Sequence, residues 1–500
     1  MKWEIDNVTV YFQKKKEEKK IMKKKRKLIT GCLVAVMAMS NIVVQYPSNM
    51  IETTMVTAKA AKQSNVKYYG SYKNVKWKVY KSGLLEVKGT GDMYDKKKGP
   101  DWLAFRNSIK SAKIEVKKPT NLSKLFYGLE YMKTVDLSKL DTSRVTDMSY
   151  MFSGCSKLQK VNLRNFNTSQ VKSMEEMFSE CSALKALDLR SFNTSQVMSM
   201  KSMFYGCSNL RTLDVSKFNT SKVTNMIDMF RGCKNVKTLN VSKFSTTNVT
   251  KMRDMFYGCK SVNALDVSNF NPAKVTDMTG VFSGCENIKT LDLRKWDMAK
   301  VKKMGSDQDR DEVMEDVEDR KFPTYGMFAD CVNLQTIKWS NVNTANVKNM
   351  GFLFYNCCSL KAIDVSSFNT ENVKCMAGMF SGCSSLKTLD VSNFNTAKVT
   401  EMSHMFWGCH GIEKLDLSSF DLSSISENYD DYYDDEKLYS HQLLDSCLQI
   451  VITPKKIGKF AFILPENEWW EDCQGKRYLT FPKNTAESIV LTKKDKNRRG

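Results

Sequence analysis

One pattern of apolar and polar positions recurs along most of the chain with a period of 26 residues. In one copy the apolar positions are Leu184, Leu187, Leu189, Phe192, Val197, Met200, Met203, Phe204 and Cys207. Burying each of these side chains is worth roughly 1.5 to 3 kcal/mol, whereas ordering the unit costs roughly 1.5 kcal/mol per residue. A single copy therefore cannot fold alone, and the pattern predicts a solenoid in which each unit packs on its neighbours.

The spacing of the apolar residues changes within each copy, which divides the copy into two halves. Leu184, Leu187 and Leu189 fit a short strand whose inward side chains stack on those of the next unit, about 4.8 Å away. In the segment 197–204 the apolar residues recur at intervals of three and four, which is typical of a short helix. The Asn-Thr-Ser segment 193–195 supplies turn and capping chemistry between the halves. We therefore predict an α/β repeat with parallel strands on one face and short helices on the other.

A cysteine stands at one fixed position of nearly every unit. These residues are Cys155, Cys181, Cys207, Cys233, Cys259, Cys285, Cys331, Cys357, Cys383 and Cys409, with Cys447 in a last, partial unit. The position faces inward, where cysteine behaves as a small buried hydrophobic residue. Side chains that are parallel in one column are poorly aimed at each other, so we predict reduced thiols. Cys358, Cys375 and Cys473 lie outside the column and are better candidates for a disulfide.

The repeats predict a solenoid of about eleven units over residues 125–447, interrupted by two acidic insertions near residues 305–324 and 427–438. Each insertion falls between the apolar residue that opens the predicted helix and the Met-Phe position, so it can leave from the outer side without disturbing the strand register. Neither insertion has the twelve-residue loop with a central glycine of an EF-hand. We predict solvated acidic loops, and the sequence leaves calcium binding open.

The start of the chain predicts an export signal. Residues 1–60 contain a basic run, then an apolar run over 28–44, and then the small-x-small sequence of Ala58 to Ala60. We predict a signal peptide with a charged N-terminal extension, removed near Ala60, and no stable transmembrane segment after cleavage. Met22 is an alternative start, and an uncleaved anchor is the alternative to cleavage.

The segments that flank the repeats predict caps. Residues 61–124 alternate apolar and polar side chains around short turns, which predicts a β-rich N-terminal cap. Residues 448–500 predict the last strand, an aromatic-rich C-terminal cap and a basic tail. Such caps cover the apolar ends that a solenoid would otherwise expose.

The repeated phrase M-F-x-G-C-S-x-L-x-x-L-D-L-S-x-F-N-T-S-x-V-T-x-M resembles the BspA-like leucine-rich repeat of bacterial surface proteins, also found in mycoplasma surface lipoproteins. The resemblance implies a horseshoe-like stack and an exported protein, secreted or on the cell surface, that binds host matrix, host cells or other microbes. Phe166, Phe192 and Phe218 stand where many leucine-rich repeats have Asn or Cys. The resemblance therefore does not imply the usual internal stack of asparagines.

Charge narrows the class of partner. The formal net charge is +22, and residues 1–60 hold twelve Lys or Arg against five Asp or Glu. The surplus in the rest of the chain favours polyanionic neighbours such as anionic wall polymers, acidic glycans or phospholipid head groups. The bases are mostly scattered lysines and no nucleic-acid motif is present, so nucleic acid is not an expected partner.

The sequence predicts no catalytic, cofactor or metal site. His404 and His410 flank Cys409, but the repeat places them at the positions of Asp228 and Ser156, which we expect to be exposed. No zinc-protease, serine-hydrolase or nucleotide-binding motif occurs. We therefore predict a protein that is not an enzyme.

The candidate interaction face is a column of outward residues on the strands. In each strand the residue between the two final apolar positions points outward, and in eight units it is an aspartate: Asp136, Asp188, Asp214, Asp266, Asp292, Asp364, Asp390 and Asp416. Carboxylates about 5 Å apart would repel by roughly 1 to 3 kcal/mol, so nearby Ser, Thr or Arg donors or bound cations must offset the repulsion. The column is either a partner surface or a hydrogen-bonded lattice that keeps the face soluble and the strands in register.

Two functions from different classes fit these features. One is an exported adhesion or interaction protein that binds a host matrix or cell-surface protein, or other microbial cells, through the solenoid surface. The alternative is a cell-envelope structural protein that its positive charge holds to anionic wall polymers.

Overall fold

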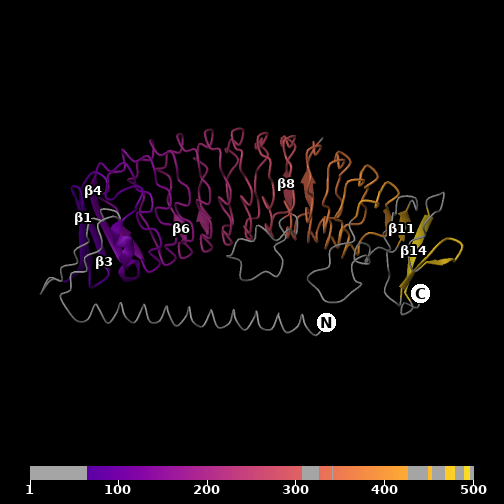
Figure 1. Cartoon of the computed structure of the whole chain (residues 1–500), viewed down its shortest axis with the longest axis horizontal. Helices are drawn as coiled ribbons and strands as arrows, with labels where there is room; N and C mark the ends of the chain where they lie inside the picture. The colour runs from indigo at the N-terminus through magenta and orange to yellow at the C-terminus, as the bar shows by residue number, and fades with distance from the viewer. Residues whose placement is uncertain are drawn as a thin grey trace, which may run out of the picture. The chain divides into compact units, whose positions relative to one another are not determined.

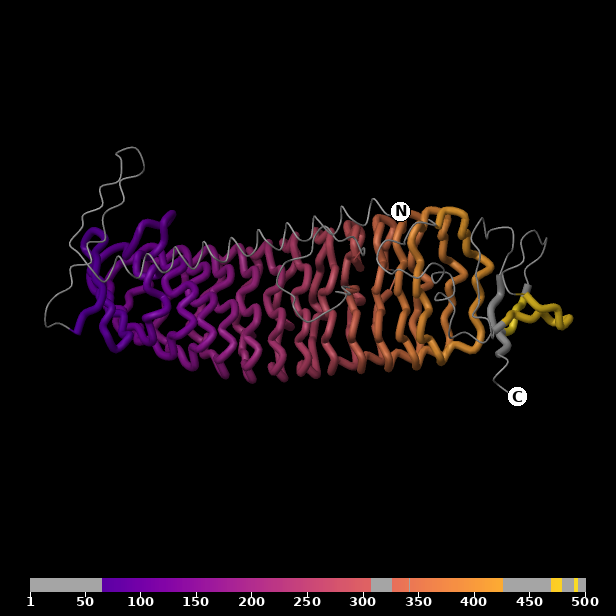
Figure 2. Tube along the Cα trace, turned by 60° about the horizontal axis from the view of Figure 1, so that its bottom comes forward, coloured from indigo at the N-terminus to yellow at the C-terminus, as the bar shows by residue number. Residues whose placement is uncertain are grey.

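The computed structural model describes residues 65–306, 326–340, 342–425, 449–452, 468–478 and 489–495. The predicted signal peptide, the acidic residues of both insertions and Cys447 lie outside the described residues. Figure 1 shows the repeats as successive coils of chain in sequence order, and Figure 2 shows the same units side by side from a second direction. The chain is a solenoid with parallel pairing between successive units.

The described chain begins with a five-stranded sheet in the order β1-β2-β3-β4-β5. Its elements are β1 (Val66–Tyr72), β2 (Val75–Tyr80), β3 (Leu84–Thr90), the 3-10 helix η1 (Asp101–Ser108), β4 (Ser111–Lys117) and β5 (Thr134–Asp136). Pairing is antiparallel from β1 to β3 and parallel from β3 to β5. The sheet therefore changes into the parallel ladder of the repeats without a break.

Aromatic side chains join this first sheet to the first repeat. Trp77 of β2 and Trp102 of η1 are fully buried and contact each other edge to face. The Trp102 indole Nε1–H donates a hydrogen bond to the Leu125 carbonyl at 3.0 Å. Gly70 of β1 lies over Trp77, where an added Cβ would stand 2.5 Å from the indole ring. Only glycine lets β1 pass this close to the ring.

The strand half of the repeats forms the predicted parallel ladder. Its named strands in the repeats are β6 (Ala186–Leu187), β7 (Thr212–Leu213), β8 (Thr290–Asp292), β9 (Thr336–Lys338) and β10 (Lys414–Asp416). In other units the same position forms an isolated parallel bridge, as between Thr238 and Ala264. β8 pairs with β9 across the first insertion, with Leu291 opposite Ile337. The insertion thus leaves the register of equivalent positions unchanged.

The predicted short helices are absent from the described repeats, so this prediction is wrong. In the segment from Met148 to Cys155, some N–H groups donate to a carbonyl three residues back in the same unit, and those between them donate to a carbonyl of the next unit. The Met151 N–H donates to the Met148 carbonyl at 3.3 Å, whereas the Phe152 N–H donates to the Met177 carbonyl at 2.9 Å. Tyr150, at a φ of 59°, reverses the chain between these turns. An α-helix would direct the N–H groups to carbonyls four residues back, and here the neighbouring unit accepts half of them.

The cysteine column lies inside, beside a column of stacked phenylalanines. Ten column cysteines, Cys155 to Cys409, are in the thiol form, and each donates its S–H to a phenylalanine carbonyl of the preceding unit at 3.1 or 3.2 Å. Phe178 and Phe204, for example, stack with ring centroids 5.9 Å apart. Each of these carbonyls also accepts a backbone N–H of its own unit, as Phe152 does from Cys155 at 3.0 Å, so the thiol is a second donor that ties the carbonyl to the next unit.

A column of buried threonines takes the place of an asparagine stack. The Thr168 hydroxyl accepts a hydrogen bond from the Asn193 N–H at 2.8 Å and donates one to the Asn193 carbonyl at 2.9 Å. The same pair of bonds recurs from Thr194 to Asn219 and from Thr220 to Ser245. One side chain thus satisfies both backbone groups of a residue in the next unit.

The last described repeat pairs with a C-terminal sheet in the order β10-β11-β14-β12-β13. β11 (Gln449–Ile452) continues the parallel ladder beside β10, and the added strands β12 (Glu468–Glu471), β13 (Arg477–Tyr478) and β14 (Ile489–Asp495) pair antiparallel. Trp470 of β12 is fully buried.

Candidate interaction surface

The aspartates of the strands lie outward, in line with the parallel register. Six of the eight, Asp136, Asp214, Asp266, Asp364, Asp390 and Asp416, are exposed, and Asp188 and Asp292 are half-buried. We call the eight the strand-face aspartates. Asn162, Asn240 and Lys338 occupy the same position in the other units and are exposed too. The face is therefore a regular row of short polar side chains.

Each strand-face aspartate is held by a hydrogen bond from its own turn. The Asp214 Oδ1 accepts the Ser216 N–H at 3.0 Å and the Ser216 hydroxyl at 2.6 Å. The Ser216 bonds lower the pKa of Asp214 below its ordinary value. Asp364 has the same pair of bonds from Ser366, at 2.9 and 2.6 Å. These bonds fix the carboxylates, and the depressed pKa of Asp214 keeps that group ionised at neutral pH.

Arginines replace serine at the two half-buried positions. Asp188 accepts hydrogen bonds from Arg190 at 2.8 Å and from Arg164 of the preceding unit at 2.9 Å, which hold its pKa far below the ordinary value. Arg294 pairs with Asp292 at 2.6 Å and lowers the pKa of that carboxyl to about 2. Repulsion along the column is thus offset by local donors, as the hydrogen-bonded lattice requires.

A second column, of opposite charge, runs beside the aspartates. It contains the exposed bases Lys185, Arg211, Lys237, Lys289, Lys361 and Lys387, each three residues before the outward residue of its strand. The strand face therefore carries one row of negative side chains and one row of positive side chains, rather than charges of a single sign. Such a surface suits a partner with complementary charged groups in a fixed arrangement.

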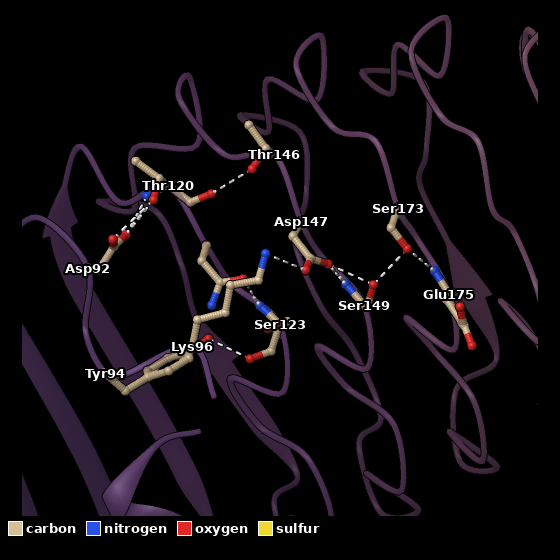
Figure 3. Close-up of polar contacts among 11 residues, drawn as sticks. Asp92, Tyr94, Lys96, Thr120, Ser123, Thr146, Asp147, Ser149, Ser173 and Glu175 are labelled. Atoms are coloured by element: carbon tan, nitrogen blue, oxygen red, sulfur yellow. Dashed lines mark hydrogen bonds and ion pairs between the residues drawn. The ribbon is translucent and has the colours of Figure 1, made fainter. Parts of the chain in front are cut away.

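A second parallel ladder in the first units, with bridges from Asn121 to Asp147 and from Asp147 to Ser173, carries the polar residues that Figure 3 shows. Asp147 accepts the Ser149 hydroxyl at 2.7 Å, and the hydroxyls of Ser149 and Ser173 lie 2.7 Å apart. Lys96 of the N-terminal sheet region reaches Asp147 at 3.4 Å. These contacts join the first sheet to the first repeats and lie on bridge positions of the second parallel ladder. We assign them a structural role.

A buried charged cluster in the middle repeats was missed by the sequence reasoning. Arg231 contacts Asp228 and Asp254, each at 3.2 Å, and its guanidinium lies over the ring of Tyr257 at 4.5 Å. Asp228 and Asp254 are 6% and 4% exposed, so the expectation that this position is exposed is wrong. The position has a positive φ and its carboxylate folds back over the neighbouring unit. Two aspartates one period apart, with an arginine between them, are the signal that identifies the cluster.

Burial raises the pKa of Asp254 to about 7 and raises that of Asp228 as well. A group whose folded pKa exceeds its unfolded value contributes stability that is present below the unfolded pKa and is lost as pH rises through the folded pKa. The free energy of unfolding of the wild type should therefore fall from pH 5 to pH 8. In Asp254→Asn the fall over the same range should be smaller. Urea denaturation at both pH values measures this difference.

Asp214→Asn is the matched control for this pH dependence, because its depressed pKa titrates below the pH window tested. It should follow the wild type between pH 5 and pH 8. Equal pH dependence of Asp254→Asn and the wild type would show that Asp254 does not titrate in this range.

The two histidines near Cys409 do not form a described metal site. His404 is half-buried, His410 is exposed, and no group of three His, Cys, Asp or Glu side chains among the described residues could hold a metal ion. Within that same part of the chain, no helix combines the length and apolar character needed to cross a membrane.

The comparisons with known proteins identify the family. The model of the family described as "Mycoplasma protein of unknown function, DUF285" matches residues 120–239, 209–314 and 324–445. The chain belongs to this family. The match confirms the predicted resemblance to BspA-like repeats, because it covers the same repeated segment. The repeats of the DUF285 family are thus the stacked units that pair in parallel in this structure.

Solved structures include two similar chains. One is a leucine-rich repeat protein from Eubacterium ventriosum, 15% identical, with a TM-score of 0.34 over 68% of this chain and 94% of that one. The other is from the Drosophila Toll–Spatzle complex, 10% identical, with a TM-score of 0.17 over 73% of this chain and 63% of that one. Comparison with curated protein sequences finds no match.

Proposed function

We propose that this DUF285 protein is exported and binds a protein partner through the strand face of a solenoid of about eleven 26-residue units. The partner would be a host matrix or cell-surface protein, or a surface protein of another microbial cell. The protein would act at the cell surface or after secretion. We propose no catalytic role, since the regular rows of outward charged side chains suit binding of a partner.

The observation that carries the proposal is the fixed geometry of the strand-face aspartates. In Asp214, Asp266 and Asp364 both local bonds go to Oδ1, so Oδ2 is the oxygen that a partner would contact. A side chain that is already held loses little conformational freedom on binding. The rows of carboxylates and bases, repeated at the strand spacing, would recognise a partner with complementary charges at matching intervals.

Replacing Asp188, Asp214 and Asp266 with asparagine tests the proposal. We call this triple change the strand-face variant. Asparagine keeps an Oδ1 acceptor for the turn but removes the charge, so the fold should persist. Because each of these exposed or half-buried charges contributes roughly 0.2 to 1 kcal/mol, the affinity for the partner should fall about tenfold. Binding of labelled protein to immobilised matrix proteins and to whole cells measures the loss.

The matched control changes three other aspartates that cap turns on a different column. Asp141, Asp297 and Asp421 each accept the N–H of the residue two positions later, at 3.0 Å. Their asparagine variant removes the same charge from the same kind of turn and should bind like the wild type. If the strand-face variant is folded and binds every tested partner unchanged, the strand face is not the site.

A further inference from the structure

The positive charge of the described chain is concentrated in the N-terminal sheet region. Residues 66–124 contain 15 Lys or Arg against five Asp or Glu. The whole chain carries a net charge of +22, so these 59 residues supply nearly half of it. The described repeats over 125–306 and 326–425 carry a similar net surplus, but it is spread over nearly five times as many residues. The density of positive charge is therefore higher in this region than in the repeats, which favours attraction of an anionic partner here.

The outer face of the first sheet gathers lysines on its central strands. β2 alternates buried Val75, Trp77 and Val79 with exposed Lys76 and Lys78. On the neighbouring strands the outward positions include Lys88 of β3, and Lys113 and Lys117 of β4. We call the outward side of β2, β3 and β4 the cap face. Its lysines lie on adjacent strands, roughly 5 Å apart across the sheet.

The two carboxylates of the cap face are already paired. Lys88 contacts Glu86 at 2.9 Å and Glu115 at 3.5 Å. Lys113 and Lys139 also contact Glu115, at 3.0 and 3.4 Å. Among the described residues, no ion pair involves Lys76, Lys78 or Lys117. The face therefore keeps a surplus of positive charge after its internal pairs are formed.

The pairing of β2 with β3 places like charges against each other. Lys76 lies directly opposite Lys88 in the antiparallel register. Like charges at directly opposed positions destabilise a sheet. Lysines often protect exposed sheet edges from pairing with other chains, but β2 and β3 are interior strands with a neighbour on each side. Edge protection therefore does not explain these lysines. The neighbouring cross-strand pairs, Lys78 with Glu86 and Lys88 with Glu115, are of opposite charge and favour the sheet, whereas Lys76 is left against a like charge.

We propose that the cap face binds a linear polyphosphodiester without bases, such as a polyol-phosphate polymer. A lysine ammonium binds phosphate as a point charge, whereas arginine forms bidentate pairs with carboxylate and phosphate alike. Lysines therefore suit phosphates spaced along a flexible chain, which need no fixed bidentate geometry. The central strands of the cap face carry lysines and no arginine. Binding of single-stranded nucleic acid needs exposed aromatic platforms for the bases. Tyr80, the outward aromatic residue of β2, is only partly exposed and its hydroxyl donates to Glu86 at 3.1 Å, whereas the exposed outward positions 76, 78, 88 and 117 hold lysine.

Lys113 lies opposite Asp136 of β5, so the cap face adjoins the first of the strand-face aspartates. Asp188, Asp214 and Asp266 lie in later repeats, and binding of the polymer does not depend on a protein partner.

The test measures binding of poly(glycerol phosphate) to the mature chain, residues 61–500, at 50 and 200 mM NaCl. Five phosphate contacts predict a slope of log affinity against log salt of about −3.5, by the single-strand relation. The affinity should therefore fall roughly a hundredfold between the two salt concentrations. A wild-type chain that does not bind the polymer at 50 mM would overturn the proposal.

The cap variant, Lys76→Gln with Lys78→Gln and Lys117→Gln, should keep the fold because these side chains are exposed. Its slope should weaken to about −1.5, with at least a tenfold loss of affinity at 50 mM NaCl, since three contacts are removed. The matched control, Lys237→Gln with Lys289→Gln and Lys387→Gln, removes equal charge from exposed positions on the strand face. It should retain the wild-type slope.

Two results would overturn the proposal even if the polymer binds. If the control loses as much affinity as the cap variant, binding reflects net charge and not the cap face. If single-stranded DNA of equal charge binds as tightly as poly(glycerol phosphate), with equal loss in the cap variant, the face does not select a polymer without bases. Arginine at positions 76, 78 and 117 should keep the wild-type slope, because the charge is retained.

Discussion

Replacing Cys207 with aspartate should prevent the surrounding repeats from folding. The Cys207 thiol is fully buried and donates to the Phe178 carbonyl at 3.1 Å. Burial also holds the thiol pKa well above its ordinary value, which favours the S–H donor. The carboxylate of an aspartate would face the Phe178 carbonyl, and both groups are acceptors. The substitution would also bury a charge without a partner, at a cost of roughly 3 to 5 kcal/mol. Far-UV circular dichroism with urea denaturation measures the loss of folded protein.

Two control substitutions distinguish the effect of a buried charge from the effects of a cavity and of an exposed charge. Cys207→Ala removes the thiol and leaves a small cavity, so it should cost only roughly 1 kcal/mol. Cys473 is exposed, and Cys473→Asp should leave stability unchanged. A Cys207→Asp chain with wild-type stability, or a disulfide joining Cys207 to Cys233, would contradict the inward thiol column.

Thr220→Val should give the second large effect. The Thr220 hydroxyl accepts the Ser245 N–H at 2.8 Å and donates to the Ser245 carbonyl at 2.9 Å. Valine matches the shape of threonine but leaves both backbone groups without a partner, at a cost of roughly 2 to 4 kcal/mol. The midpoint of urea denaturation should fall accordingly.

Thr220→Ser is the control, because serine keeps the hydroxyl and loses only a methyl group. It should lie close to the wild type. If valine and serine have equal effects, the loss comes from packing and the threonine column does not join the units by hydrogen bonds.

The strand half of each repeat could be predicted because its signal is simple. Leu187 and Leu189 alternate with an outward residue, and only a strand gives this period of two. The helix prediction failed because Met200, Met203 and Phe204 also fit successive turns that share their N–H groups with the next unit. Spacing within one unit carries no information about hydrogen bonds between units. Stacking places carbonyls of the next unit within reach of these N–H groups, so turns form in place of a helix.

Two columns show what sequence patterns omit. Thr194 was expected to supply turn or capping bonds within its own unit, yet it is 1% exposed and its hydroxyl bonds to the next unit. Its recurrence in nearly every unit was the available signal. The position of Asp228 and Asp254 was expected to be exposed, yet both side chains are buried. Two aspartates one period apart with Arg231 between them were the available signal. The interaction role of the strand-face aspartates stays a prediction.

The most direct test of the account measures two kinds of binding on one panel of proteins. The wild type, the strand-face variant and the cap variant are each assayed against immobilised matrix proteins with whole cells, and against poly(glycerol phosphate). The account predicts that the strand-face variant loses only the protein partner and that the cap variant loses only the polymer. If both folded variants lose both kinds of binding equally, or neither loses any, the assignment of two separate surfaces is wrong.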